Sequence, residues 1–188
     1  MQIVDSLGSA RAHPSILEAL VSGRRHTASL VCSPSGEFVD EHGTSKGLGG
    51  PVDKQWLISL RRSSAVVLTS GKTFRAEEYR MPKKSDLAVL SKSSVDPQTL
   101  NLQTGQKVIQ FEHSSYSSAA TELVRDGYRR IHIEYGPQGM RSLIESGFEF
   151  DLWLSGDSDK AVQLGASRLG VNAQILLRVD GLSIALAY

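Results

Sequence analysis

Short apolar runs alternate with amphipathic helical stretches along most of this chain, and this alternation restricts the fold more than any other feature. Runs rich in β-branched and other apolar residues predict strands at 27–32, 65–68, 87–90, 107–111, 131–134 and 150–154. Helical spacing of apolar residues predicts helices at 14–20, 51–62, 117–127, 137–147 and 157–170. We therefore predict an α/β fold with a central, mostly parallel sheet flanked by helices, closed by an antiparallel C-terminal hairpin around Asp180-Gly181.

A polar, glycine-rich stretch at 33–50 separates the first strand from the helix that opens on Pro51. It predicts a long loop, with a short strand at Phe38-Val39. Loops of this length in a compact domain usually carry function. The length of 188 residues fits one domain spanning 1–188, in which residues 1–26 form an N-terminal extension.

The charge balance and the cysteine count exclude several classes of function. The formal net charge is +1, from 21 basic and 20 acidic side chains, so nothing directs the chain to nucleic acid. The basic doublets, among them Arg61-Arg62, are scattered, and we expect them on solvated helix faces or ends. One cysteine, Cys32, permits no internal disulfide and no multi-cysteine zinc site. No membrane span or signal peptide is recognisable, so we expect a cytoplasmic protein.

The run "VVLTSGKTF" (66–74) ends on Gly-Lys-Thr, which resembles half of a phosphate-binding P-loop. A P-loop needs another glycine five residues before Gly71, where this chain has Val66. With the strand running to Leu68, the remaining loop is too short to encircle a phosphate. A P-loop nucleotide hydrolase is therefore excluded.

Two strand ends nevertheless have the composition of ligand-binding turns. One carries the small residues of 69–73; the other, "IHIEYGPQGM" (131–140), runs through Gly136 into a helix that starts at Pro137. Ligands bind at the carboxyl ends of strands in open α/β sheets, and a helix start suits a pyrophosphate. Taken alone, each is better explained as an ordinary tight turn. Together they favour a dinucleotide.

Two longer blocks resemble a known family. "GTSKGLGGPVDKQWLISLRRSSAVVLTSGKTFRAEEY" (43–79) and "RRIHIEYGPQGMRSLIESGFEFDLWLS" (129–155) are similar to the pyrimidine-reductase family, the RibD C-terminal domain of riboflavin biosynthesis. With the tail "LRVDGLSIALAY" the resemblance covers most of residues 27–188. It implies a dihydrofolate-reductase-like fold and an NADPH-dependent reductase that converts a ribosylamino-pyrimidine to its ribitylamino form.

Carried over position by position, the resemblance also implies a set of site residues. The implied cofactor NADPH would contact Thr69, Ser70, Gly71, Lys72, Thr73, Tyr135, Gly136 and Pro137. The implied pyrimidine substrate would lie near Ser35, Gly36 and Ser45, with Glu134 and Glu77 as the candidate catalytic carboxyl groups. Lys72 is equally well explained as a solvated lysine at a loop tip. Relatives of this kind commonly pair, and apolar terminal strands would leave an exposed edge, so we expect a homodimer.

Three positions depart from the family pattern and keep a second function open. Ser35 replaces an acidic residue, Tyr135 replaces a glycine beside the cofactor, and Leu152 replaces an acidic residue. The ring of Tyr135 either points away from the crevice or fills it. The alternative is a diverged, non-catalytic relative that binds a nucleotide-like ligand or serves as an interaction protein.

Two further residues invite other interpretations. His132-x-Glu134 resembles part of a zinc deaminase site, but one cysteine cannot supply the remaining ligands, so His132 is expected to be a packing residue. Asp53 lies in the first turn of its helix, where the helix dipole favours an acid. A carboxylate on the corresponding helix of dihydrofolate reductases contacts the pterin, which leaves a folate-type substrate as a weaker alternative.

Overall fold

A computed structural model describes residues 14–188 of the chain. The first half of the predicted N-terminal extension, residues 1–13, lies outside the described residues. Contacts group the described chain into two compact units. One contains residues 14–22, 29–59 and 151–188; the other contains residues 23–28 and 60–150. Whether the chain forms one folding domain stays a prediction.

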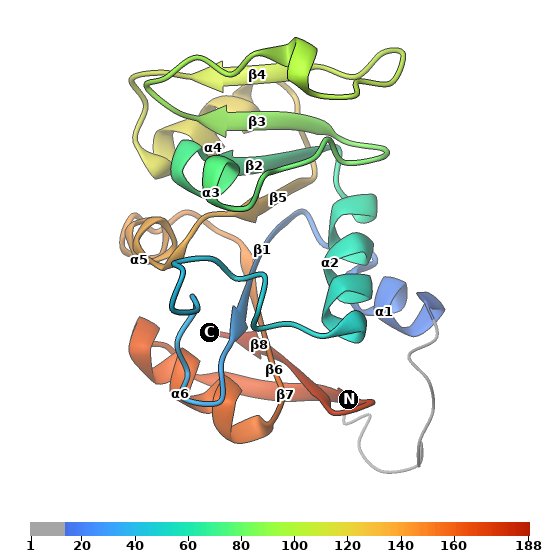
Figure 1. Ribbon diagram of the computed structural model, residues 1–188, viewed down its shortest axis with the longest axis vertical. Coiled ribbons are helices and arrows are strands. Elements are labelled where there is room, and N and C mark those ends of the chain that lie inside the picture. Colours follow the sequence, from blue (N-terminus) through green and yellow to red (C-terminus); the bar gives the residue numbers. More distant parts are fainter. Residues whose placement is uncertain (1–13) are drawn as a thin grey trace. The chain divides into compact units, whose positions relative to one another are not determined.

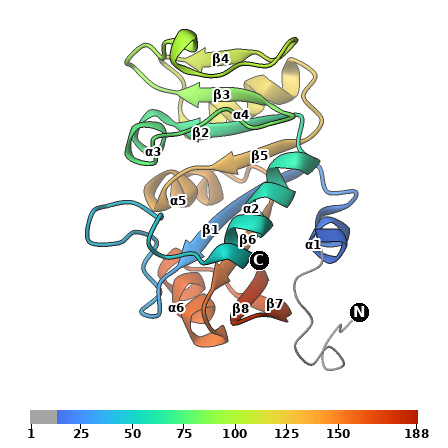
Figure 2. The ribbon, with the colours of Figure 1, turned by 45° about the vertical axis from the view of Figure 1, so that its right-hand side comes forward.

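The unit of residues 23–28 and 60–150 is built around a parallel sheet. Its strands are β2 (Val66–Ser70), β3 (Asp86–Leu90), β4 (Val108–Phe111), β5 (Ile131–Glu134) and the first half of β1 (His26–Cys32). The hydrogen-bonded order is β4-β3-β2-β5-β1, and every pair in it is parallel. Figures 1 and 2 both show β4, β3 and β2 side by side in this order. The central strands β2 and β5 are buried along their whole length, as neighbours on both sides require.

Four short helical segments follow strands of this unit along the chain. They are α3 (Gly71–Ala76), the 3-10 turn η1 (Pro97–Thr99), α4 (Tyr116–Arg125) and α5 (Pro137–Glu145). Ser115 caps α4 by accepting a hydrogen bond from the Ser118 N–H, and proline opens α5 as the sequence predicts. An apolar cluster that includes Val67, Leu87 and Val89 packs the sheet together with Tyr79 and Leu100.

The other unit contains the antiparallel part of the fold. Its elements are α1 (Pro14–Val21), the second half of β1, most of α2 (Pro51–Ser63), β6 (Asp151–Gly156), α6 (Asp159–Leu169), β7 (Ala173–Val179) and β8 (Leu182–Ala187). β8 pairs antiparallel with both β6 and β7, and α6 lies against β6 and β8 (Figure 1). Trp56 and Trp153 meet edge to face, with ring centroids 5.1 Å apart.

These findings confirm the predicted fold class. Eight strands are ordered β4-β3-β2-β5-β1-β6-β8-β7, and the last two form the hairpin predicted at Asp180-Gly181. Both turn residues have positive φ angles, +44° and +76°, as a two-residue turn between strands demands. Among residues 14–188, no helix has both the length and the apolar character needed to cross a membrane.

Two local predictions are wrong. No strand forms at Phe38-Val39, because the chain turns twice there: the Gly36 N–H donates to the Ser33 oxygen, and the Ser33 N–H donates to the Glu37 oxygen. The strand expected at 65–68 continues to Ser70, and Gly71 starts a helix that the sequence analysis missed. Ser70 makes this possible, since its hydroxyl accepts a hydrogen bond from the Thr73 N–H (3.1 Å) and caps the helix. No loop remains between strand and helix, which strengthens the exclusion of a P-loop.

Candidate functional site

The structure brings together the two strand ends that the sequence singled out. β2 and β5 are adjacent and parallel, and Thr69 is the register partner of Glu134. The Thr69 hydroxyl donates a hydrogen bond to the Glu134 backbone oxygen (3.1 Å), so the ends of the two strands are fixed to each other. The carboxyl ends of neighbouring parallel strands are where ligands bind in open α/β sheets.

Beyond the strand ends, Gly136 lies close to Thr73. A Cβ atom placed on Gly136 would lie 3.7 Å from Thr73 Oγ1 and within 4 Å of no other group outside the glycine's immediate neighbours. Gly136 precedes α5, and it has no side chain to cap the helix. The start of α5 therefore offers a positive dipole end beside a half-buried glycine, a combination that fits a pyrophosphate.

Of the other predicted cofactor residues, some have structural roles and others have side chains that a ligand can reach. Ser70 is occupied as the cap of α3, and its oxygen lies 3.0 Å from Thr73 Oγ1. Gly71 packs tightly: a Cβ atom there would lie 2.6 Å from the Ser91 Cβ. Lys72 is exposed and Thr73 is half-buried, so these two side chains remain open to a ligand.

A segment that the sequence analysis missed lies at the end of the next strand. Ser91 follows β3, and its hydroxyl accepts a hydrogen bond from the Arg75 guanidinium (3.3 Å). The Gln110 side-chain amide holds the backbone oxygens of Ser91 and Ser93 (3.2 and 3.1 Å). Residues 91–94 read Ser-Lys-Ser-Ser and contain no acid.

Tyr135 does not fill the crevice, because its ring points into the interior. Only 1% of the residue is exposed, its hydroxyl donates to the Tyr116 backbone oxygen (3.1 Å), and the two rings meet edge to face at 4.8 Å. Burial raises the pKa of this phenol far above its usual value. The departure from the family's glycine is therefore accommodated by packing against α4.

Glu134, predicted as a catalytic carboxyl group, is held in an ion pair. Arg61 donates from Nε to Oε1 (2.6 Å) and from Nη2 to Oε2 (2.7 Å), and the Tyr79 hydroxyl donates to Oε2 (2.8 Å). Burial alone would raise the pKa of Glu134, but the charge and hydrogen bonds of Arg61 outweigh it and hold the pKa below its usual value. Glu134 is therefore ionised and cannot supply a proton near neutral pH.

The expectation that both arginines of the 61–62 doublet are solvated is wrong for Arg61. Only 25% of its side chain is exposed, and its guanidinium lies over the Tyr79 ring, 4.7 Å from the centroid. Arg62 is exposed as expected. Sequence alone cannot tell which of two adjacent arginines forms an ion pair, because the partner of Arg61 is 73 residues away.

His132 is buried beside this ion pair. It is fully shielded from solvent, with Nδ1 2.9 Å from Thr27 Oγ1 and Nε2 3.5 Å from Glu134 Oε1. Burial lowers the pKa of His132 to about 4, although the charge of Glu134 opposes the shift. The imidazole is therefore neutral at pH 7, in keeping with a packing residue.

We expect this histidine to make the protein sensitive to mild acid. Because the folded pKa of about 4 is below the unfolded value of roughly 6.5, only the unfolded state takes up the proton between these values. The free energy of unfolding should therefore fall by about 2 kcal/mol between pH 7 and pH 5. Urea unfolding at both pH values measures this, and His132→Asn should remove most of the fall. His113→Asn, at an exposed histidine, should leave it intact; an equal fall in both variants would contradict the assignment.

The remaining predicted residues lie outside this cluster of contacts. Glu77 caps the end of α3 and is half-buried. Ser35, Gly36 and Ser45 belong to the other unit. There Ser35 is exposed, and Gly36, with φ +78°, is packed beneath α6.

Asp53 belongs to the same unit as Gly36. Its carboxylate accepts a hydrogen bond from the Ser155 hydroxyl (2.5 Å), and burial raises the pKa of the carboxyl group.

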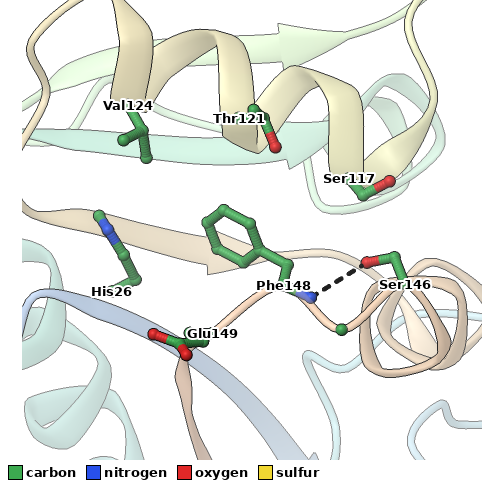
Figure 3. A pocket seen from close by; sticks show the side chains of 8 residues that line it. His26, Ser117, Thr121, Val124, Ser146, Phe148 and Glu149 are labelled. Atoms are coloured by element: carbon green, nitrogen blue, oxygen red, sulfur yellow. Dashed lines mark hydrogen bonds between the residues drawn. The ribbon is translucent and has the colours of Figure 1, made fainter.

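A pocket of about 490 Å³ lies away from the strand ends, between α4 and the segment after α5. Figure 3 shows Thr121 and Val124 projecting from α4 toward Phe148, whose N–H donates to the Ser146 hydroxyl (3.4 Å). The rings of His26 and Phe148 are 5.5 Å apart. None of the predicted site residues lines this pocket, so we place the candidate site at the ends of β2, β3 and β5.

Comparison with known proteins identifies relatives through structure only. No protein-family model matches the sequence, and no curated protein matches it. A pyrimidine reductase-like protein from Corynebacterium diphtheriae is similar with a TM-score of 0.66 and 18% identity, over 92% of this chain and 98% of that one.

Two further solved structures are similar at 12% identity. RibD from Acinetobacter baumannii has a TM-score of 0.60 over 90% of this chain, which spans 59% of that protein. A riboflavin biosynthesis reductase from Saccharomyces cerevisiae has a TM-score of 0.56, over 87% of this chain and 89% of that one. The chain has the fold of these proteins, the group that its sequence blocks resemble.

Proposed function

We propose that the chain is an NADPH-dependent reductase acting on a pyrimidine-type substrate, of the kind that reduces a ribosylamino-pyrimidine in riboflavin biosynthesis. The observation that carries the proposal is the close approach of Gly136, at the start of α5, to Thr73, at the ends of two parallel strands. Each strand end alone is ordinary. Two such strand ends, fixed to each other through Thr69 and Glu134, have the composition expected of a site for a dinucleotide pyrophosphate.

When bound, NADPH would supply the hydride. The first turn of α5 and the Thr73 hydroxyl would hold its pyrophosphate. Arg75 and Lys92, beside a strand end without an acid, would favour the phosphate on its ribose and hence NADPH over NADH. Glu134 is excluded as proton donor by its ion pair, which leaves Glu77 or water for that role.

The substrate side of the proposal rests on the resemblance. Ser35 and Ser45 stay candidates for contact with the pyrimidine. Gly36 is better explained by its packing under α6 than by substrate contact.

The homodimer stays a prediction as well. The structure reduces the exposed sheet edge on which that prediction was based to a single strand. β8 lies between β6 and β7, so only β7 presents an edge at that end of the sheet.

A non-catalytic relative that binds a nucleotide is the second candidate, and two observations favour it. The carboxylate of Glu134 is committed to Arg61, and Ser35 stands where the family has an acid. This candidate binds NADPH without oxidising it. Calorimetric titration with NADPH and NADH tests binding, and loss of absorbance at 340 nm, the usual signal of the reduced nicotinamide, tests turnover with a ribosylamino-pyrimidine. Failure to bind either dinucleotide would eliminate both candidates.

We expect Gly136→Val to weaken NADPH binding by roughly tenfold or more, about 1.4 kcal/mol, because its side chain would occupy the space in front of Thr73. Gly136 has a φ of −66°, which any residue adopts, so stability should change little. Gly50→Val is the matched control, since Gly50 also precedes a proline that opens a helix and has no group within 4 Å of its Cβ position. Unchanged NADPH affinity in the folded Gly136 variant would place the cofactor elsewhere.

A further inference from the structure

The turn proposed to hold the cofactor begins immediately after Glu134, and that residue is anchored twice. Its side chain receives two parallel hydrogen bonds from Arg61, and its backbone oxygen receives one from Thr69. Thr69 and Glu134 therefore connect the strand of one cofactor turn to the strand of the other. Arg61 comes from a third element, the last turn of α2. The position of the Tyr135–Pro137 turn thus depends on a contact made by a helix outside the sheet.

The placement of this ion pair indicates that it orients the end of β5 more than it stabilises the fold. A buried ion pair adds little stability compared with apolar residues of the same volume, since both charges lose their hydration. Other buried positions of β2 and β5 hold such residues, among them Leu68 and Ile133. The charged pair occurs only at the strand ends that border the candidate site. A two-pronged arginine–carboxylate contact also fixes orientation, which an apolar contact does not.

We propose that Arg61 is a positioning residue for the cofactor. By holding Glu134 ionised and oriented, it fixes the end of β5 and therefore the distance between Gly136 and Thr73. Arg61 itself does not contact the cofactor. This inference rests on the proposed function, because it concerns the same NADPH site.

Removal of Arg61 should leave a carboxyl group that titrates near neutral pH. Among residues 14–188, the groups that face Glu134 are Arg61, the Tyr79 hydroxyl and the neutral His132, so Arg61 is the cation that compensates its charge. A buried glutamate without a countercharge has a pKa raised by several units. In Arg61→Met, we expect Glu134 to be neutral at pH 6 and charged at pH 8.5. Because Glu134 lies beside His132, this titration belongs to the pair of side chains. The charged form would draw solvent to the end of β5 and displace the turn.

The experiment measures the NADPH dissociation constant of each variant, divided by that of the parent protein, at pH 6 and at pH 8.5. Dividing by the parent value cancels any effect that pH has on NADPH itself, because that effect is the same for both proteins. For Arg61→Met we expect the ratio to rise roughly tenfold between the two pH values. Combining this change with Glu134→Gln removes the titrating group, so the ratio should become constant. Arg61→Lys keeps the positive charge but loses the two-pronged contact, and it should show a raised but constant ratio.

Arg62→Met is the matched control, at an exposed neighbour on the same helix turn, and its ratio should be one throughout. Parent protein that binds no NADPH refutes the proposed function itself. If the parent binds, a folded Arg61→Met with the same ratio at both pH values overturns the positioning role. Should Arg61→Met fail to fold, the lysine variant decides, because affinity equal to that of the parent would show that the two-pronged contact does not position the turn.

Discussion

Replacing Arg61 with methionine is expected to lower the free energy of unfolding by about 3 kcal/mol at pH 7. The change leaves the carboxylate of Glu134, of which only 10% is exposed, without its countercharge. Removal of one partner of a buried pair costs roughly 3–5 kcal/mol, and the 25% exposure of the Arg61 side chain places this pair at the lower end. The loss reflects the cost of a buried carboxyl group that must stay unpaired or take up a proton, more than the worth of the original contact.

The double variant Arg61→Met/Glu134→Gln separates these two contributions. Glutamine keeps the shape of Glu134 and can still accept a hydrogen bond from the Tyr79 hydroxyl. We therefore expect the double variant to be more stable than Arg61→Met alone, which makes the two changes strongly non-additive. Urea unfolding followed by circular dichroism gives the free energies, and hydrogen exchange of β2 and β5 shows where the loss occurs. Additive effects would mean that the two side chains do not interact in solution.

Gly36→Ala should also destabilise the protein by roughly 3 kcal/mol, although Gly36 was predicted to bind substrate. Its φ of +78° costs an alanine about 1 kcal/mol. The new Cβ atom would lie 2.5 Å from the Leu164 Cβ and 2.8 Å from the Gly165 backbone nitrogen, so helix α6 must move, at a further cost of roughly 1–3 kcal/mol.

Gly43→Ala isolates the steric part of this effect. Gly43 has a similar φ of +75°, but nothing lies within 4 Å of its Cβ position, so it should lose only about 1 kcal/mol. Trp56 and Trp153 are both buried in the unit that contains Gly36, and their fluorescence in urea reports its unfolding. Equal losses in the two variants would show that α6 does not press on Gly36 and would return Gly36 to the candidate substrate residues.

The sequence by itself determined the fold class of this protein and most of its elements, although it missed α3 and wrongly predicted a strand at Phe38-Val39. Alternation of strand and helix patterns predicts a parallel sheet, and local signals are enough to place Pro51, Pro137 and the Asp180-Gly181 turn. Such signals act within a few residues, where side-chain chemistry fixes the backbone directly. The same local chemistry singled out two strand ends, at Thr69–Thr73 and at Glu134–Pro137, which the structure places side by side; their role in cofactor binding stays a prediction.

Only the tertiary structure decided what the individual site residues do. Glu134 was a candidate acid until Arg61, 73 residues earlier in the chain, proved to hold it ionised. The direction of the Tyr135 ring was open until the structure showed it packed against Tyr116. Gly36 was a candidate substrate residue until the structure showed it packed against α6. In each case the deciding neighbour is distant in sequence and adjacent in space. Burial, ionisation and steric contact depend on such neighbours, and no short stretch of sequence contains them.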